Sequence, residues 1–206
     1  MRLHNLIAAL VLVVNCSLTS WAQEVISDCD VHGSARMERP EYRLNVYKNR
    51  YKFPRKSDFI TGITLRQLLE SGNEDDFPIE KAVILTGYVY DVKMGGVETC
   101  NCKATDQDHR DTHIELTPDA NHTGPEYRLI VEVTPRIRTL LAMKGMDWST
   151  SELKDMLVGH RVKVAGWLFY DEEHKSQAFA TRPNGDRNWR ASCWEVHPVT
   201  YIKTLD

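Results

Sequence analysis

The sequence lacks a strong charge of either sign, a membrane-spanning apolar run and a nucleophile motif. The formal net charge of the 206 residues is −3. A nucleic-acid binder that neutralises phosphates is usually basic, so this balance argues against DNA or RNA as a partner. No apolar stretch approaches the roughly 20 residues that cross a bilayer. No G-x-S-x-G pattern is present, so nothing in the sequence points to a serine or cysteine nucleophile.

The first 22 residues have the three-part form of a secretory signal. A short polar start is followed by an apolar run at residues 6–14, and residues 20–22 put small side chains at the positions that signal peptidase reads. A lipid on Cys16 is the alternative, but Asn15 is a poor residue before a lipidated cysteine. We therefore expect cleavage after Ala22 and an exported protein, periplasmic or extracellular.

The rest of the chain divides into a leader, an N-terminal elaboration and one main domain. Residues 23–43 are polar and without a clear period, which predicts a loose leader. Residues 44–80 are too few for a core of their own, so we expect them to pack on the main domain. Within them, residues 44–51 suggest a short strand, and Thr64 caps one short helix with Leu65, Leu68 and Leu69 on one face.

Residues 81–206 give the element order of a five-stranded OB-like barrel. Strands are predicted at residues 82–92, 110–116, 127–133, 161–170 and 191–202, with helical spacing at 137–143 and 151–158. This barrel type has a helix between strands three and four and binds ligands on the face of strands two and three. Gly87 fits a close approach within the first strand. The competing fold is an open α+β sandwich with the same elements.

Alternation along the strands sorts the polar side chains onto the outside of the barrel. Any antiparallel strand with one face in water has such a polar side, so the pattern alone defines no site. The concentration of histidines and carboxylates is what makes this outer wall a candidate. Its members are Asp111, His113, Glu115, Arg128, Glu132, Glu195 and His197.

The long loop at residues 171–190 adds arginines beside a tryptophan. Such a combination is typical of a surface that grips an anionic or planar ligand through forked hydrogen bonds and stacking. The alternative is a solvated loop whose Trp189 packs on the barrel end. The candidate ligand-binding residues are His113, Arg128, Arg187, Trp189, Arg190, Glu195 and His197.

After removal of the signal, four cysteines remain, and an even number in an exported protein favours disulfides. Two of them lie in the loop after the first strand and Cys193 follows the other long loop, at the same end of the barrel. We therefore expect Cys193 to pair with Cys100 or Cys102, and Cys29 with the remaining one. No cofactor is expected in that case. The alternative is a zinc or other divalent metal site made by Cys100, Cys102, His109 and His113, although this spacing is not a strong zinc pattern.

Residues 87–93, 111–116, 164–171 and 194–199 resemble segments of exported, uncharacterised bacterial proteins with an OB-like barrel. The most specific pieces are the D-x-H-I stretch that starts at Asp111 and the W-E-x-H-P-V stretch that starts at Trp194. The resemblance covers most of residues 44–202. It implies the barrel and the export, and it implies no catalytic residue.

These features favour an exported, non-enzymatic binding module that holds a glycan, an anionic small molecule or a protein partner between its two long loops. A metal-dependent hydrolase or nuclease is the second hypothesis, because imidazoles and carboxylates hold ions that activate water. Its candidate ligands or bases are His113, His174, Glu195 and His197. The third hypothesis is a structural protein of the cell envelope. The partner is thus an unknown ligand or an envelope protein.

Overall fold

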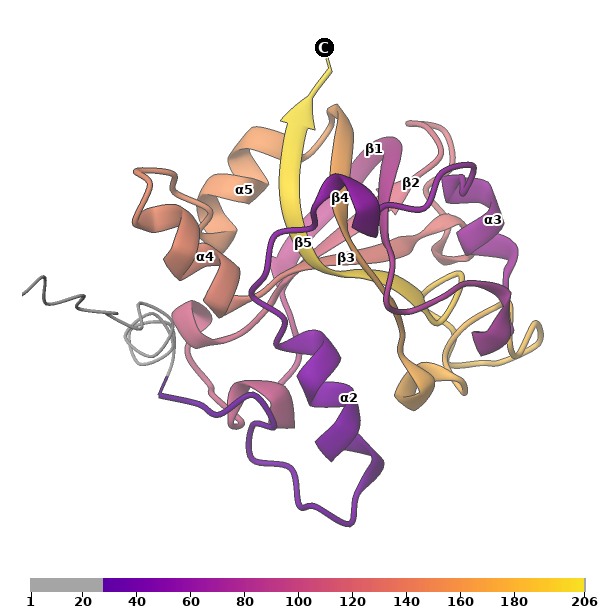
Figure 1. The fold of residues 1–206 in the computed structure, drawn as a ribbon. Helices are drawn as coiled ribbons and strands as arrows, with labels where there is room; N and C mark the ends of the chain where they lie inside the picture. Colours follow the sequence, from indigo (N-terminus) through magenta and orange to yellow (C-terminus); the bar gives the residue numbers. More distant parts are fainter. Residues whose placement is uncertain (1–27, 206) are drawn as a thin grey trace, which may run out of the picture.

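The computed structural model describes residues 28–205, so the predicted signal and the start of the leader lie outside the described residues. Five strands form a closed barrel in the order β1-β2-β3-β5-β4 (Figure 1). They are β1 (Ala82–Met94), β2 (Thr112–Thr117), β3 (Leu129–Val133), β4 (Arg161–Tyr170) and β5 (Trp194–Thr204). Helices α4 (Pro135–Ala142) and α5 (Thr150–Leu157) connect β3 to β4. The predicted mainly-β, OB-like barrel is therefore confirmed.

The barrel closes through a short parallel pairing between β3 and β5, which joins Ile130 to Glu195 and Val131 to Val196. All other strand pairs are antiparallel. At Gly87 in β1, a Cβ atom would lie 2.6 Å from the side chain of Leu116 in β2. Any larger residue would push the two strands apart, which explains the glycine at this position.

The inner faces of the strands form one apolar core. Ile114, Val131 and Val196 are fully buried in it, and helix α3 (Leu65–Glu70) adds Leu68. Thr64 caps α3 as predicted, because its hydroxyl accepts a hydrogen bond from the backbone N–H of Gln67. In β2 and β3, strand alternation therefore separates this core from the polar outer wall as predicted.

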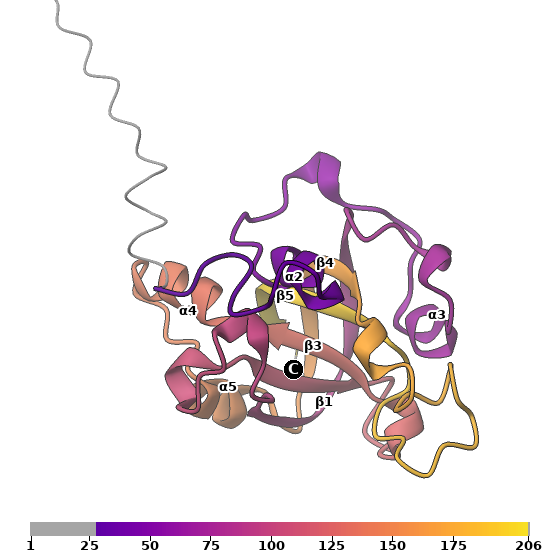
Figure 2. The ribbon, with the colours of Figure 1, turned by 90° about the horizontal axis from the view of Figure 1, so that it is seen from below.

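Residues 40–48 differ from the prediction, because they form helix α2 (Pro40–Lys48) where a loose leader and a strand were expected. Pro40 suits the first turn of a helix, where its missing N–H costs nothing. The buried residues of α2 are Asn45 and Lys48, so the helix has a polar buried face and no apolar period that could reveal it. It lies against β5 and the short 3-10 helix Thr99–Asn101 (Figure 2).

The cysteine pairing agrees with the prediction only in part, because Cys29 pairs with a cysteine of the loop after β1 and Cys193 does not. Cys29 forms a disulfide with Cys102, and Cys100 and Cys193 are free and buried. Cys193 was expected to bond to Cys100 or Cys102, but its side chain belongs to the apolar core, with its sulfur 4.0 Å from the Thr181 hydroxyl. It therefore does not reach the loop after β1. Among residues 28–205, no helix has the length and apolarity needed to cross a membrane.

Candidate metal centre

The outer wall lies on the predicted side of the strands, but most of it is buried. Glu115, Glu132, Glu195 and His197 are each at most 3% exposed. This burial is caused by the segment around α2, which covers the outer wall and which the sequence did not predict. Lys48 at the end of α2 is buried, and in the segment that follows the helix Arg50 donates to the carbonyl of His197 in β5. The outer face therefore lines a second buried region, which is polar and which we call the polar interior.

Three potential metal ligands from three segments converge in this interior. Asp111 precedes β2, Glu132 lies in β3 and His197 lies in β5. One ligand atom of each lies within 4.8 Å of the other two. His197 Nε2 is 3.9 Å from Asp111 Oδ2, and His197 Nδ1 is 3.4 Å from Glu132 Oε2. We call Asp111, Glu132 and His197 the triad.

Each triad residue has one polar atom held by a neighbour. Asn101 Nδ2 donates to Asp111 Oδ2 at 2.9 Å, and His197 Nδ1 is hydrogen-bonded to Glu195 Oε2 at 3.2 Å. Glu132 Oε1 has an ion-pair contact of 2.7 Å with His113 Nε2, which makes no hydrogen bond among residues 28–205. The other atom of each residue is buried and has no hydrogen-bond partner among residues 28–205; these atoms are Asp111 Oδ1, Glu132 Oε2 and His197 Nε2. A buried polar atom without a partner costs about 1–3 kcal/mol, so three in one place require an explanation.

The triad has too little positive charge around it for its two carboxylates. Burial raises the pKa of Asp111 and, more strongly, that of Glu132, although the attraction of His197 opposes both shifts. Burial by itself would lower the pKa of His197, but the charge of Glu132 and the hydrogen bond to Glu195 outweigh it and raise that pKa. A bound cation would favour the charged form of both carboxylates and would therefore oppose these upward pKa shifts.

The neighbouring buried charges are matched. Arg190 Nη1 lies 2.6 Å from Glu195 Oε1, and both side chains are at most 1% exposed. Lys48 Nζ lies 2.8 Å from Asp171 Oδ2 and 2.7 Å from Glu98 Oε2. Burial would raise the pKa of Glu98, but Lys48 lowers it to about 2. With Lys48 and Arg190 engaged in this way, His197 is the main counter-charge of the triad.

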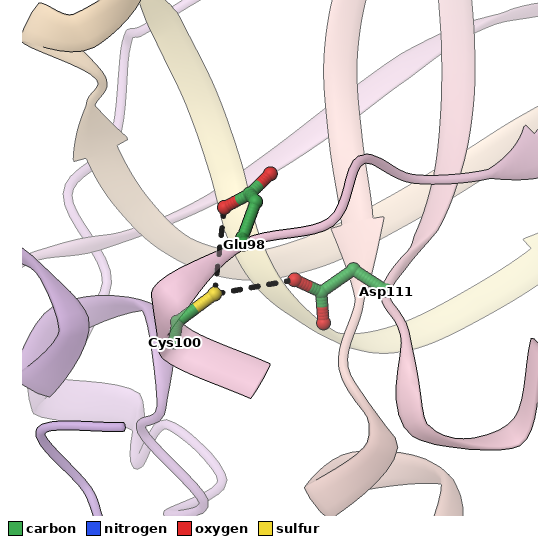
Figure 3. Close-up of side chains that lie close together, drawn as sticks. All are labelled: Glu98, Cys100 and Asp111. Carbon is green, nitrogen blue, oxygen red and sulfur yellow. Dashed lines mark hydrogen bonds between the residues drawn. The ribbon is translucent and has the colours of Figure 1, made fainter. Parts of the chain in front are cut away.

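A second group of potential ligands shares Asp111 with the triad. The Cys100 sulfur lies 3.4 Å from Glu98 Oε2 and 3.8 Å from Asp111 Oδ2 (Figure 3). Burial raises the pKa of the Cys100 thiol well above its usual value, and the charges of Asp111 and Glu98 add to the shift. The thiol and both carboxylates point toward one another (Figure 3).

The predicted ligand-binding residues do not gather in one open groove. His113, Glu195 and His197 lie in the polar interior, and Arg190 is buried with them. Arg128 lies outside, with its guanidinium 3.3 Å from Glu115 and stacked 4.1 Å from the Tyr90 ring. Arg187 is exposed in the loop. Trp189 is half-buried and stacks on His113, with 6.3 Å between ring centroids.

Neither predicted ligand set matches the observed groups. The set of Cys100, Cys102, His109 and His113 is wrong, because Cys102 is in the disulfide and His109 is 72% exposed beside Asp106. In the hydrolase set, His174 contacts Gln177 at 2.8 Å and belongs to neither group. His197 alone is shared between that set and the triad.

Sequence reasoning missed four residues of the centre. Asp111 and Glu132 were placed on the outer wall but not among the candidate ligands, and Lys48 and Glu98 were not considered. The available signal was the strand alternation, which puts Asp111, His113 and Glu132 on the same face of the sheet. Lys48 and Glu98 offered no such signal, since they come from a helix and a loop.

No family model, curated protein or solved structure matches this chain. The resemblance to exported barrel proteins therefore stays a prediction.

Proposed function

We propose that this protein is an exported metal-binding barrel in which Asp111, Glu132 and His197 hold a divalent transition-metal ion. One observation carries the proposal. Asp111, Glu132 and His197 each have one ligand atom within 4.8 Å of the other two, and each has a buried atom without a hydrogen-bond partner in the described part of the chain. A cation bound by one ligand atom of each residue would balance the charge of both carboxylates.

The donor types favour zinc and its transition-metal neighbours over calcium or magnesium, because one ligand is an imidazole nitrogen. Glu195 supports this role from the second layer. Its hydrogen bond to His197 Nδ1 leaves Nε2 for the metal, and Arg190 in turn holds Glu195. A carboxylate that orients a metal-bound histidine in this manner is a recurrent feature of protein metal sites.

The burial of the ligands favours holding an ion over catalysis. All three triad residues are at most 3% exposed, so a substrate larger than water has no open approach to the ion. The hydrolase hypothesis has less support for this reason. A ligand held between the two long loops also has less support, because Arg190 and Arg128 are already paired with carboxylates.

The test measures zinc bound to the intact protein. Protein stripped with a chelator is dialysed against zinc, and bound metal is counted by elemental analysis. We expect Glu132→Gln to lose one bound ion that the wild type retains. His122→Ala is the matched control, because its imidazole also contacts a carboxylate, Asp119 at 2.9 Å, but on the surface. A reloaded wild type with no zinc above the buffer level would refute the proposal.

Export is the other part of the proposal. The Cys29–Cys102 disulfide supports it, because such bonds persist in oxidising compartments. Mass spectrometry of the mature protein is expected to find Gln23 at its N-terminus. Protein that keeps Met1 and stays in the cytoplasm would contradict this.

A further inference from the structure

We propose that Glu98, Cys100 and Asp111 form a second ion position, so that the centre holds two ions bridged by Asp111, one of them bound by a thiolate. This inference rests on the proposed function and specifies which metals the site takes.

The position of Asp111 is the first argument. Its Oδ2 atom lies 3.8 Å from the Cys100 sulfur and 3.9 Å from His197 Nε2, so it stands between the two groups. Paired metal ions in proteins lie about 3.5–4 Å apart and use carboxylates that both ions share. Asp111 is 2% exposed, and its other oxygen has no hydrogen-bond partner among the described residues. The carboxylate of Asp111 is therefore shared by the two groups, with Oδ2 between the Cys100 sulfur and His197 Nε2.

The surroundings of Cys100 are the second argument. The chain has two free, buried cysteines among residues 28–205. Cys193 packs in the apolar core, where a free cysteine acts as a small hydrophobic residue. Cys100 is 1% exposed and lies outside that core, with its sulfur directed at Glu98 and Asp111 (Figure 3). A thiol between two carboxylates suits a cation better than it suits packing.

Coordination at this position would exchange a proton for an ion. The S–H bond of Cys100 breaks, its proton passes to solvent, and the sulfur binds the metal as a thiolate. Lys48 keeps Asp171 as its partner at 2.8 Å when Glu98 turns to the ion. The side chain of Glu98 is 22% exposed, so this position lies on the solvent side of the centre. Thiolate ligation selects thiophilic ions such as Zn²⁺, Cd²⁺ and Co²⁺.

Cobalt(II) is the probe, because a thiolate ligand gives it a sulfur-to-metal charge-transfer band in the near ultraviolet. The protein is loaded by dialysis without a reductant, so that the Cys29–Cys102 disulfide persists. We expect two bound cobalt ions and the band in the wild type. Cys100→Ser should lose the band and one ion, and the control Cys193→Ser should keep both. Glu98→Gln, which leaves both free thiols in place, should also lose one ion.

The triad variant separates the two proposals. His197→Ala should keep one cobalt ion together with its band. If the wild type binds one ion without the band and His197→Ala binds none, the second position is overturned and the proposed function stands. One ion with the band, lost in both Cys100→Ser and His197→Ala, would mean a single shared site and also overturn the second position. A protein that binds neither cobalt nor zinc would overturn both proposals.

Discussion

Two buried polar regions lie next to each other on the outer face of the same barrel, and they differ in how their charges are satisfied. Around Arg190, the guanidinium donates to Glu195 and to the carbonyls of Ser192 and Trp194. In the triad, two carboxylates share one imidazole, and three ligand atoms have no hydrogen-bond partner within the described residues. Buried charges can thus have all their hydrogen-bond and charge partners, as in the complete network around Arg190, or only some of them, as in the incomplete network of the triad. The incomplete network is the one for which we propose a bound cation.

The largest effect is expected from a substitution that breaks the complete network around Arg190. Arg190→Met should lower the free energy of unfolding by about 3–5 kcal/mol, because Glu195 would remain buried without its counter-charge. Chemical denaturation at neutral pH measures it. Arg187→Met is the control, since this exposed arginine lies in the same loop and its loss should change stability by no more than about 0.5 kcal/mol. Equal stability of the two variants would show that the Arg190 network contributes little.

This comparison also marks the limit of what the sequence predicted. The strands were predictable, because apolar alternation and the glycine and proline residues at their ends are local signals; the range 161–170 agrees with β4. The outer wall was predictable for the same reason. Its burial was not, because the covering helix α2 buries Asn45 and Lys48 and so has no apolar period.

The cysteine pairing was beyond local reasoning for a related cause. Cys193 lies just before β5, where strand alternation no longer fixes the direction of a side chain, and it turned into the core. The partner of Cys102 came from the segment before α2, whose place depends on the whole fold. Long-range contacts of this kind have no periodic signature in one sequence.

A smaller effect, of opposite sign, is expected in the incomplete network. In metal-free protein at neutral pH, Glu132→Gln should raise the free energy of unfolding by about 1 kcal/mol, since it removes a buried charge with an unsatisfied oxygen. Burial raises the pKa of Glu132, so the folded state holds this proton more tightly than the unfolded state. Glu132 therefore contributes fully to stability at pH values below its pKa in the unfolded state. This contribution is lost as the pH rises through its pKa in the folded state.

Denaturation curves of the metal-free protein from acid to neutral pH measure this difference. The wild type should lose more stability than Glu132→Gln as pH rises through that window, and zinc should remove the difference by stabilising the wild type alone. Glu126→Gln serves as the control, because Glu126 lies on the surface in the 3-10 helix Pro125–Tyr127. Parallel curves for the wild type and Glu132→Gln would mean that Glu132 carries no buried charge.

The smallest effect concerns the edge of the polar interior, where Trp189 stacks on His113, and His113 contacts Glu132 at 2.7 Å. Trp189 is half-buried, and its indole N–H donates to Gln177 in the same loop. Trp189→Ala should therefore cost about 1 kcal/mol or less, whereas Trp194→Ala should cost about 3–5 kcal/mol, because Trp194 is fully buried in the apolar core. Thermal melts of the two variants should separate clearly. If Trp189→Ala melts as early as Trp194→Ala, the loop at residues 171–190 belongs to the core, and the polar interior has no solvent edge on this side.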